Sequence, residues 1–271
     1  MQDTLESLVI QNFSKDQYEI IVVDNGSNDS TLNVAKNFVE QYPGLIRYVI
    51  EDKVQSSYAA RNKGIQIAEG KILAFTDSDC VPCESWLAEG CKALKKNNAS
   101  MVAGKIEFTF KHSQPNIWEN FDSAGKLNQK SYVQNAGFGA TANLFVRKEM
   151  FTKYGLFLSE LESGGDYEFG RRLTESGEIL LYNEDAVVRH PARSTFWDKY
   201  NKSRRIARGQ KHLCNMGLLA HGKLSWRQLI PTLNVPLKSR MNRSVKINLI
   251  LINNLFRYLN YFWRFTYRPS K

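Results

Sequence analysis

A regular alternation of β-branched runs and amphipathic segments over the first 105 residues constrains the fold of this chain more than any other feature. The runs that predict strands are residues 19–23, 45–50, 71–76 and 101–104. The segments that predict helices are residues 30–42, 57–69 and 82–97. Strands that alternate with helices are typical of an α/β fold, in which helices cover a mostly parallel sheet. Ligands bind such sheets at the carboxyl ends of the strands.

Carboxylates follow two of these predicted strands. Asp24 ends the first run, and Asp77 and Asp79 follow the third. On a regular strand, residues two apart point to the same side, so Asp77 and Asp79 can present their carboxylates together. Mg²⁺ and Mn²⁺ prefer carboxylate oxygens as ligands. The pattern therefore indicates a divalent metal site, with a solvated turn as the alternative.

Four segments resemble, in this order, the family 2 glycosyltransferases. They are EIIVVDNGSNDST, AARNKGIQIAEGKILAFTDSDCVP, GFGATANLFVRKEMFTKYGLF and GGDYEFGRRL, and the resemblance covers roughly residues 4–193. It implies the GT-A fold, a Rossmann-like, mostly parallel sheet flanked by helices. It also implies a nucleotide-diphosphate sugar as donor and Mn²⁺ or Mg²⁺ as cofactor.

The resemblance implies roles for four residues in donor binding. Asp24 matches the carboxylate that recognises the nucleotide base or ribose, and Arg61 matches a basic residue near the base and diphosphate. Asp77 and Asp79 match the DxD motif, with Asp77 toward the ribose and sugar and Asp79 on the metal. A turn-capping aspartate and an exposed helix arginine remain the alternatives for Asp24 and Arg61.

Two further positions match the end of the family pattern. Asp166 matches the general base that deprotonates the acceptor hydroxyl in an inverting transfer. The family often has Glu before this aspartate, whereas Gly165 stands here, and Glu168 projects to nearly the opposite side of a helix. His190 matches a metal ligand of some members, although a lone His is more often structural. The alternative for Asp166 and Glu168 is acids that complement a helix dipole.

The resemblance also implies a strand before the helix-like segment Leu5–Gln11, where only Met1–Thr4 precede it. We therefore expect a shortened chain whose sheet lacks its first strand, which would leave exposed edges. No signal peptide is readable at this end. The four cysteines are too few and too unevenly placed for a disulfide framework, so Cys80 and Cys83 are interpreted as bystanders.

Charge divides the chain. Residues 199–271 hold sixteen Lys and Arg and no Asp or Glu, so residues 1–198 carry the other 21 bases and all 27 acids, a net charge of −6. This division predicts a glycosyltransferase domain over residues 1–193 and a basic helical region over 194–271. An amphipathic helix is expected at about 245–268, lying on an anionic membrane surface or packed on the protein's own body.

The resulting hypothesis is a glycosyltransferase that moves a sugar from a nucleotide-diphosphate donor to a glycan or lipid-linked acceptor. We expect inverting, metal-dependent transfer in polysaccharide or cell-surface glycan synthesis, by a cytoplasmic protein peripheral on the inner face of the cell membrane. The alternative is an inactive sugar-nucleotide-binding or scaffold protein. Nucleic acid is not an expected partner, because the basic region lacks a recognised motif.

Overall fold

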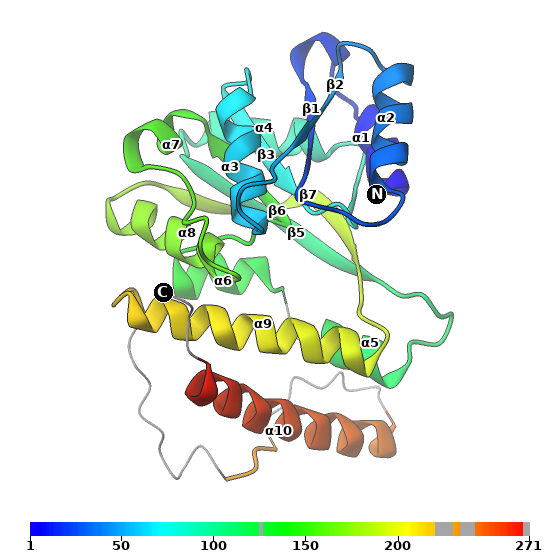
Figure 1. The fold of residues 1–271 in the computed structure, drawn as a ribbon, viewed down its shortest axis with the longest axis vertical. Helices are drawn as coiled ribbons and strands as arrows, with labels where there is room; N and C mark the ends of the chain where they lie inside the picture. Colours follow the sequence, from blue (N-terminus) through cyan, green and yellow to red (C-terminus); the bar gives the residue numbers. More distant parts are fainter. Residues whose placement is uncertain (125–126, 220–229, 234–241, 268–271) are drawn as a thin grey trace. The chain divides into compact units, whose positions relative to one another are not determined.

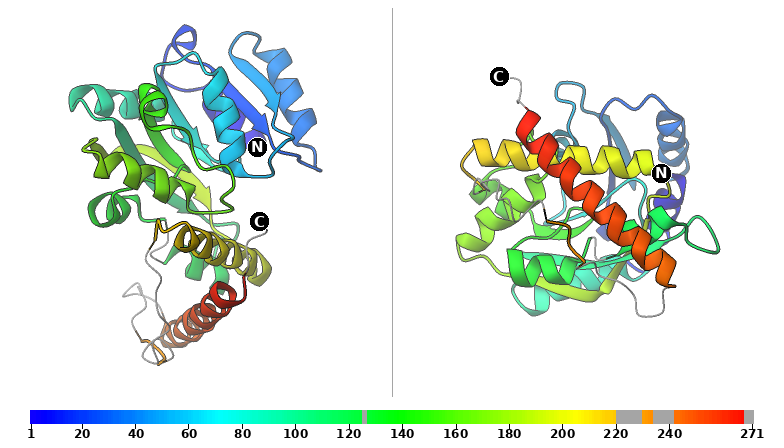
Figure 2. Two further views of the ribbon diagram at one scale, coloured as in Figure 1. Left: turned by 60° about the vertical axis from the view of Figure 1, so that its left-hand side comes forward. Right: turned by 90° about the horizontal axis from the view of Figure 1, so that it is seen from below.

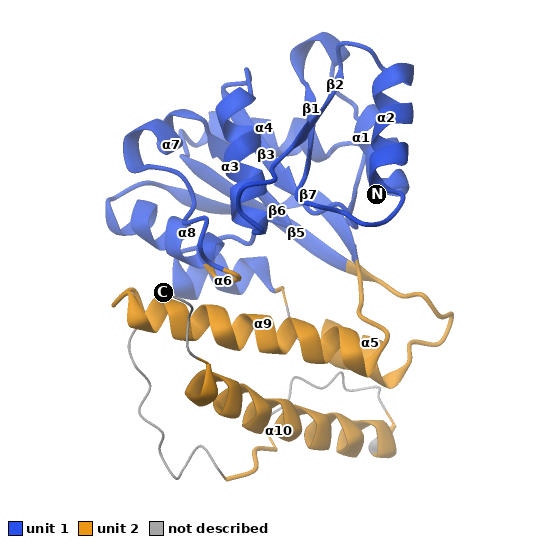
Figure 3. Ribbon diagram, in the orientation of Figure 1, with its two compact units in different colours: residues 1–107, 128–161, 165–190 blue, residues 108–127, 162–164, 191–271 orange. Residues whose placement is uncertain are grey.

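The computed structural model describes residues 1–124, 127–219, 230–233 and 242–267 (Figure 1). The chain forms two compact units, shown in different colours in Figure 3. Unit 1 is Met1–Glu107, Asn128–Leu161 and Gly165–His190, and unit 2 is Phe108–Leu127, Glu162–Gly164 and Pro191–Lys271. Unit 2 thus takes in residues 108–127, which the sequence assigns to the first domain. The division into domains 1–193 and 194–271 stays a prediction.

Up to residue 105 the strands of unit 1 alternate with helices as the periodicity of the sequence predicts, except that the two-residue strand β4 directly follows β3. The strands are β1 Ile20–Asp24, β2 Ile46–Ile50, β3 Ile72–Thr76, β4 Val81–Pro82, β5 Met101–Thr109, β6 Asn143–Arg147 and β7 Leu180–Pro191. The helices are α1 Gln2–Val9, α2 Thr31–Gln41, α3 Ser57–Ile67, α4 Trp86–Lys96, α6 Gln129–Ala136, α7 Glu149–Tyr154 and α8 Gly165–Glu175, with a short 3₁₀ turn at Lys15–Gln17. The expected α/β class is therefore confirmed.

Two separate sheets form among the described residues. β1 and β2 pair in parallel, and the second sheet has the order β3-β6-β5-β7-β4. β6 is antiparallel to both β3 and β5, and β4 is antiparallel to β7. The mostly parallel pairing that the sequence predicts is thus interrupted, because β6 enters between strands that precede it in the chain. Among the described residues, β1 pairs only with β2 and β3 pairs only with β6.

Helix α3 lies against β1 because alternate residues of this strand face opposite sides. Ile20 packs in a cluster with Leu5 of α1 and Phe38 of α2. On the other face, a Cβ atom at Gly64 of α3 would lie 3.4 Å from the side chain of Val23. At this ordinary van der Waals distance α3 packs on β1 and lies beside the carboxyl end of the strand.

The turn after β3 is anchored in the core of the five-stranded sheet. Cys80 is fully buried in a cluster with Trp86, Val102, Phe145 and Val188. The rings of Trp86 and Phe145 pack with centroids 4.9 Å apart. Because Cys80 is held in this cluster, the preceding residues 77–79 are fixed at the carboxyl end of β3.

Unit 2 is helical, with α5 Ile117–Ser123, α9 Phe196–Asn215 and α10 Arg243–Thr266. α9 and α10 are neighbours in the left view of Figure 2 and cross each other in the right view. Phe121 of α5 and Leu249 and Phe256 of α10 form a core against which Phe196 and Tyr200 of α9 pack. The predicted amphipathic helix corresponds to α10, and the predicted end at residue 268 lies outside the described residues. None of the described helices has both the length and the hydropathy needed to cross a bilayer.

Candidate active site

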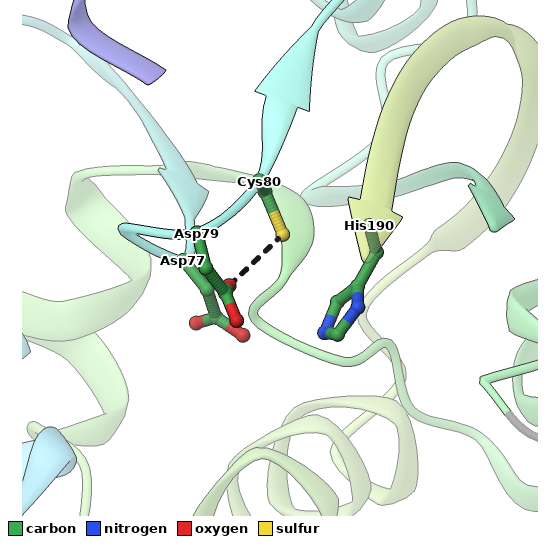
Figure 4. Close-up of side chains that lie close together, drawn as sticks. All are labelled: Asp77, Asp79, Cys80 and His190. Atoms are coloured by element: carbon green, nitrogen blue, oxygen red, sulfur yellow. Dashed lines mark hydrogen bonds between the residues drawn. The ribbon is translucent and has the colours of Figure 1, made fainter. Parts of the chain in front are cut away.

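Four side chains converge at the end of β3, as Figure 4 shows. The ligand atoms of Asp77, Asp79, Cys80 and His190 all lie within 4.8 Å of one another. The backbone N–H of Cys80 donates to the carbonyl of Asp77 at 3.0 Å, which closes the turn. β4 pairs antiparallel with β7 in the register Val81↔Arg189, and this pairing places His190 beside the turn. Residues 110 positions apart thereby form one cluster.

The chemistry of this cluster fits a divalent cation. Two carboxylates and an imidazole are ligands that Mn²⁺ accepts, and Mg²⁺ would be held through the carboxylate oxygens. Burial raises the pKa of the Cys80 thiol, and Asp77 and Asp79 raise it further, so the thiol stays protonated and is a poor ligand for a hard cation. The two carboxylates and the imidazole therefore form a donor set that fits Mn²⁺ or Mg²⁺.

Helix α3 connects Asp77 to Asp166 through two neighbouring side chains. Arg61 donates to Asp77 Oδ1 at 2.7 Å. The guanidinium of Arg61 lies 5.5 Å from the centroid of the Tyr58 ring, a cation–π arrangement. The Tyr58 hydroxyl in turn donates to Asp166 Oδ1 at 3.3 Å. The side chains at positions 58 and 61 share a helix face, so one turn of α3 contacts both carboxylates.

The segment that precedes Asp166 is also attached to α3. Ser56 caps the helix by accepting from the Tyr58 N–H, and its hydroxyl donates to the carbonyl of Leu161 at 3.1 Å. The Asn62 side chain donates to the carbonyl of Phe157 at 2.8 Å and accepts from the Phe157 N–H at 3.1 Å. These three hydrogen bonds fix the chain that leads into α8.

Asp166 lies in the first turn of α8 with a pKa above its ordinary value. The protein packed around the carboxyl group raises the pKa, while Arg61, the Tyr167 N–H and the Tyr58 hydroxyl partly oppose this. The Tyr167 N–H donates to Asp166 Oδ1 at 3.0 Å. A raised pKa makes the carboxylate a stronger base, provided that it is ionised at the working pH.

Tyr58 accounts for the glycine that departs from the family pattern at position 165. A Cβ atom at Gly165 would lie 2.9 Å from two atoms of the buried Tyr58 ring, closer than side chains normally approach. A glutamate in this backbone position would therefore collide with the ring. Gly165 leaves Asp166 in place and gives Tyr58 the space to reach it.

Glu168 serves a different purpose from Asp166. It is buried, and Arg172 bonds to both of its oxygens, at 2.8 and 2.9 Å. Arg172 also donates to the carbonyls of Tyr154 and Leu156. The pair thus ties α8 to the end of α7, so neither residue is available to a substrate, whereas Arg171 bonds to Glu175 nearer the surface.

Asp24 lies at the end of β1, where it also stabilises the turn. Its carboxylate accepts from the Ser27 N–H and the Tyr48 hydroxyl, each at 2.9 Å. Hydrogen bonds from Ser27 lower the pKa of Asp24, and Tyr48 lowers it further. Within the part of the chain that the structure describes, no hydrogen bond joins the Asp24 carboxylate to Arg61 or Asp77. Asp24 therefore caps the turn, and a contact with the nucleotide stays a prediction.

Tyr58 is a residue of the site that the sequence pattern did not predict, although one signal was available. Tyr58 precedes Arg61 by three residues in a predicted helix, so both face the same side. Its contact with Asp166 joins it to a helix 108 residues later in the chain, which local spacing does not specify.

Comparison with known proteins assigns the chain to a family. The model of glycosyl transferase family 2 matches residues 1–155. The chain belongs to this family. The glycosyltransferase AglE of Haloferax volcanii is 37% identical over 210 residues, which cover 78% of this chain and 68% of AglE. The chain is therefore a glycosyltransferase that spans about two thirds of the length of this relative.

Two other proteins show different degrees of similarity. The Escherichia coli protein WfgD, a UDP-Glc:α-D-GlcNAc-diphosphoundecaprenol β-1,3-glucosyltransferase, is 25% identical over 136 residues, half of this chain and 51% of WfgD. The mannosyltransferase PcManGT of Pyrobaculum calidifontis, solved with GDP-Man and Mn²⁺, has a TM-score of 0.62 at 16% identity, over 97% of this chain and 67% of PcManGT. The structural similarity shows that the fold is GT-A.

We predict that Gly165→Ala destabilises the protein by about 1–3 kcal/mol, because the added methyl group collides with Tyr58. In a Tyr58→Ala background the same change should have little effect, because the ring is gone. Urea denaturation of the four proteins of this double-mutant cycle measures the coupling. Gly64→Ala is the control, since its Cβ meets Val23 at an ordinary 3.4 Å. Equal losses at position 165 in both backgrounds would contradict the contact.

Proposed function

We propose that this glycosyltransferase transfers a sugar from a nucleotide-diphosphate donor to a hydroxyl of a glycan or lipid-linked acceptor, with inversion and with a divalent metal. The observation that carries the proposal is the series of contacts Asp77–Arg61–Tyr58–Asp166. It connects the carboxylate cluster that can bind a metal to the carboxylate that can act as a base. Inverting transfer needs both parts in fixed relation, because the acceptor attacks the face opposite the leaving diphosphate.

Donor binding is assigned to residues at the strand ends. In this proposal Asp24 accepts a hydrogen bond from the base or ribose, Asp77 faces the ribose and sugar, and Arg61 holds the diphosphate with its fork of N–H donors. Asp79 and His190 hold the metal. When bound, Mn²⁺ or Mg²⁺ neutralises negative charge on the diphosphate. Arg61 then exchanges part of its bond to Asp77 for the phosphate oxygens.

Asp166 acts as the general base. Its carboxylate takes the proton of the acceptor hydroxyl while that oxygen forms a bond to the anomeric carbon. The bond between this carbon and the diphosphate oxygen breaks, and its electron pair leaves with the nucleoside diphosphate. Tyr58 orients the carboxylate through its hydroxyl, and the raised pKa of Asp166 increases its basicity.

The relatives support the substrate class. PcManGT is solved with GDP-Man and Mn²⁺, a nucleotide sugar and a divalent metal. The name of WfgD specifies UDP-Glc and an acceptor linked to diphosphoundecaprenol. We propose a donor and an acceptor of the same chemical classes for this chain, and a place in polysaccharide or cell-surface glycan synthesis.

Two substitutions separate the proposed steps. Asp166→Asn should keep Mn²⁺-dependent donor binding and lower transfer by about 10²–10⁴-fold, because only the base is lost. Asp79→Asn should weaken donor binding itself in the presence of Mn²⁺. Calorimetry with UDP- and GDP-sugars and a transfer assay measure the two effects, with the exposed Asp52→Asn as control. Donor binding by the wild type without transfer to any acceptor would favour the inactive, sugar-nucleotide-binding alternative.

The pH dependence of transfer tests the hydrogen bond of Tyr58. Its hydroxyl stabilises the ionised form of Asp166 and so lowers that pKa. Tyr58→Phe removes the donor, and the acid limb of the kcat/KM profile should move to higher pH. Tyr154→Phe removes a hydroxyl that bonds to Glu178 instead and should leave the profile unchanged. An acid limb that stays in place in Tyr58→Phe would refute Asp166 as the titrating base.

We further propose that unit 2 binds an anionic membrane surface, on the inner face of the cell membrane. α10 uses one apolar strip within the unit, where Leu249, Phe256 and Trp263 are buried. A second strip remains exposed, with Leu251, Phe262 and Phe265 each at least 60% exposed, together with Ile247 and Leu255. Sixteen Lys and Arg without an acid over residues 199–271 supply the matching charge.

Vesicle flotation tests this surface. Phe262→Ser and Leu251→Ser should each weaken binding to phosphatidylserine-containing vesicles by roughly tenfold, because each removes an apolar side chain from the membrane. Asn248→Ser, an exposed polar position of α10, is the control. Vesicles of neutral lipid should bind less, and added salt should weaken the anionic ones. Tighter binding to DNA than to these vesicles at the same salt would contradict the membrane proposal.

A further inference from the structure

A carboxylate in unit 2 is surrounded by more positive charge than it can neutralise. Asp122, near the end of α5, is fully buried. Lys199 Nζ donates to Asp122 Oδ1 at 2.8 Å, and Lys202 Nζ lies 3.5 Å from the same oxygen. The other oxygen, Oδ2, accepts from the Arg193 N–H at 3.2 Å and from Arg193 Nη1 at 3.5 Å. When all three cations are ionised, they leave a net charge of +2 around the one carboxylate.

The three cations are themselves mostly buried. Their side chains are 6% exposed in Lys199, 12% in Lys202 and 24% in Arg193. Lys199 also lies over the Phe121 ring, 5.0 Å from its centroid. Burying a charge is unfavourable unless an opposite charge and hydrogen bonds compensate it. A single aspartate compensates one of these cations.

A nearby carboxylate shows what a balanced arrangement looks like. Glu119, one turn earlier in α5, is also fully buried. It accepts from the backbone N–H groups of Lys111 and Asn116, at 2.7 and 2.8 Å, and contacts His112. Its oxygens are satisfied mainly by neutral donors that cap the helix. The surplus of cations is therefore particular to Asp122 and is not a general property of α5.

Among the described residues, Lys202 is the cation of this cluster whose ammonium group lacks a hydrogen-bond acceptor. Its Nζ atom is buried and forms no hydrogen bond to the part of the chain that the structure describes. Burial lowers the pKa of Lys202 to about 7, although Asp122 opposes this. Burial raises the pKa of Asp122, and Lys202, Lys199 and Arg193 outweigh it, so this carboxyl stays ionised. An added anion would hold Lys202 in its charged form and occupy its donors.

We propose that Arg193, Lys199 and Lys202 form a binding site for a phosphoryl group. A phosphoryl group carries close to two negative charges and three acceptor oxygens. The charge matches the net charge of the cluster, and the oxygens can accept from the N–H groups of Lys202 that have no acceptor in the described residues. Arg193 offers a planar fork to two oxygens, and the lysines offer point charges. The site lies within unit 2 and involves no residue of the proposed active site. It therefore goes beyond the proposed function and does not depend on it.

Calorimetry with inorganic phosphate on the full chain tests this site, in the presence of EDTA so that the carboxylate cluster holds no metal. We expect saturable binding at one site. Lys202→Gln should weaken it about tenfold or more, the effect of losing a charged hydrogen bond. Arg205→Gln removes an exposed cation of the same helix and should change affinity less than about twofold. Equal losses in both variants would mean diffuse attraction, which overturns the proposal.

Two further measurements keep the outcome decisive. Lys202→Met retains the apolar stem and should fold at least as well as the wild type, so lost phosphate binding in this variant is not unfolding. Phosphate should raise Tm of the wild type and not of Lys202→Met. Absence of saturable binding in the wild type would show a closed ion network with a neutral lysine, and the proposal would be wrong.

The source of the phosphoryl group is distinguished by parallel arms of the experiment. Inorganic phosphate, a nucleoside diphosphate and vesicles that contain phosphatidic acid are compared on the wild type and Lys202→Gln. A Lys202-dependent preference for the vesicles indicates a phosphorylated lipid, and one for the nucleoside diphosphate indicates a soluble nucleotide. Binding of none of the three, or losses independent of Lys202, counts against the site.

Discussion

The ion pair between Arg61 and Asp77 joins the two halves of the proposed catalytic machinery. Arg61 reaches Asp77 at 2.7 Å from a helix that also carries Tyr58, and Tyr58 reaches Asp166. The side chain of Arg61 is 17% exposed and that of Asp77 is 36% exposed, so the pair is only partly screened by water. A bound diphosphate would compete with Asp77 for the guanidinium. In the proposed mechanism, donor binding and the placement of the base thus depend on the same turn of α3.

Local pattern was sufficient for the elements of unit 1 up to residue 105 and insufficient for their pairing. The alternation of strands and helices up to residue 105 follows from apolar periodicity and stop signals, which act over a few residues. The antiparallel insertion of β6 between β3 and β5 joins segments some 40 to 70 residues apart. The pair Val81↔Arg189 joins residues that are still farther apart in the sequence, and this pair places His190 beside Asp79. Such pairings are chosen by packing of the whole sheet.

In the candidate site, too, residues within one element could be predicted from the sequence, whereas contacts between distant elements could not. Asp77 and Asp79 were readable because an apolar strand ends in two carboxylates, and Asp166 because of a resemblance to known enzymes. Gly165 reads as a defect in the sequence, because its reason is the Tyr58 ring that fills the space beside it. The cations around Asp122 were invisible as a group, since α5 and α9 lie more than 70 residues apart in the chain. The spacing of residues in the sequence predicts a site when all its residues belong to one helix or strand. It does not predict a site whose residues come from several elements.

Unit 2 combines two features that a purely structural helical layer does not need. A helix that only packs on its neighbours requires one apolar strip, yet α10 exposes a second one formed by bulky side chains such as Leu251 and Phe262. A buried carboxylate needs one cation, yet Asp122 has three. Exposing the apolar strip to water is unfavourable, and burying surplus cations is unfavourable without a further anion. A partner that is both apolar and anionic would offset both. A phosphorylated lipid presents both properties in one molecule, so one class of partner would compensate both excesses of the same unit.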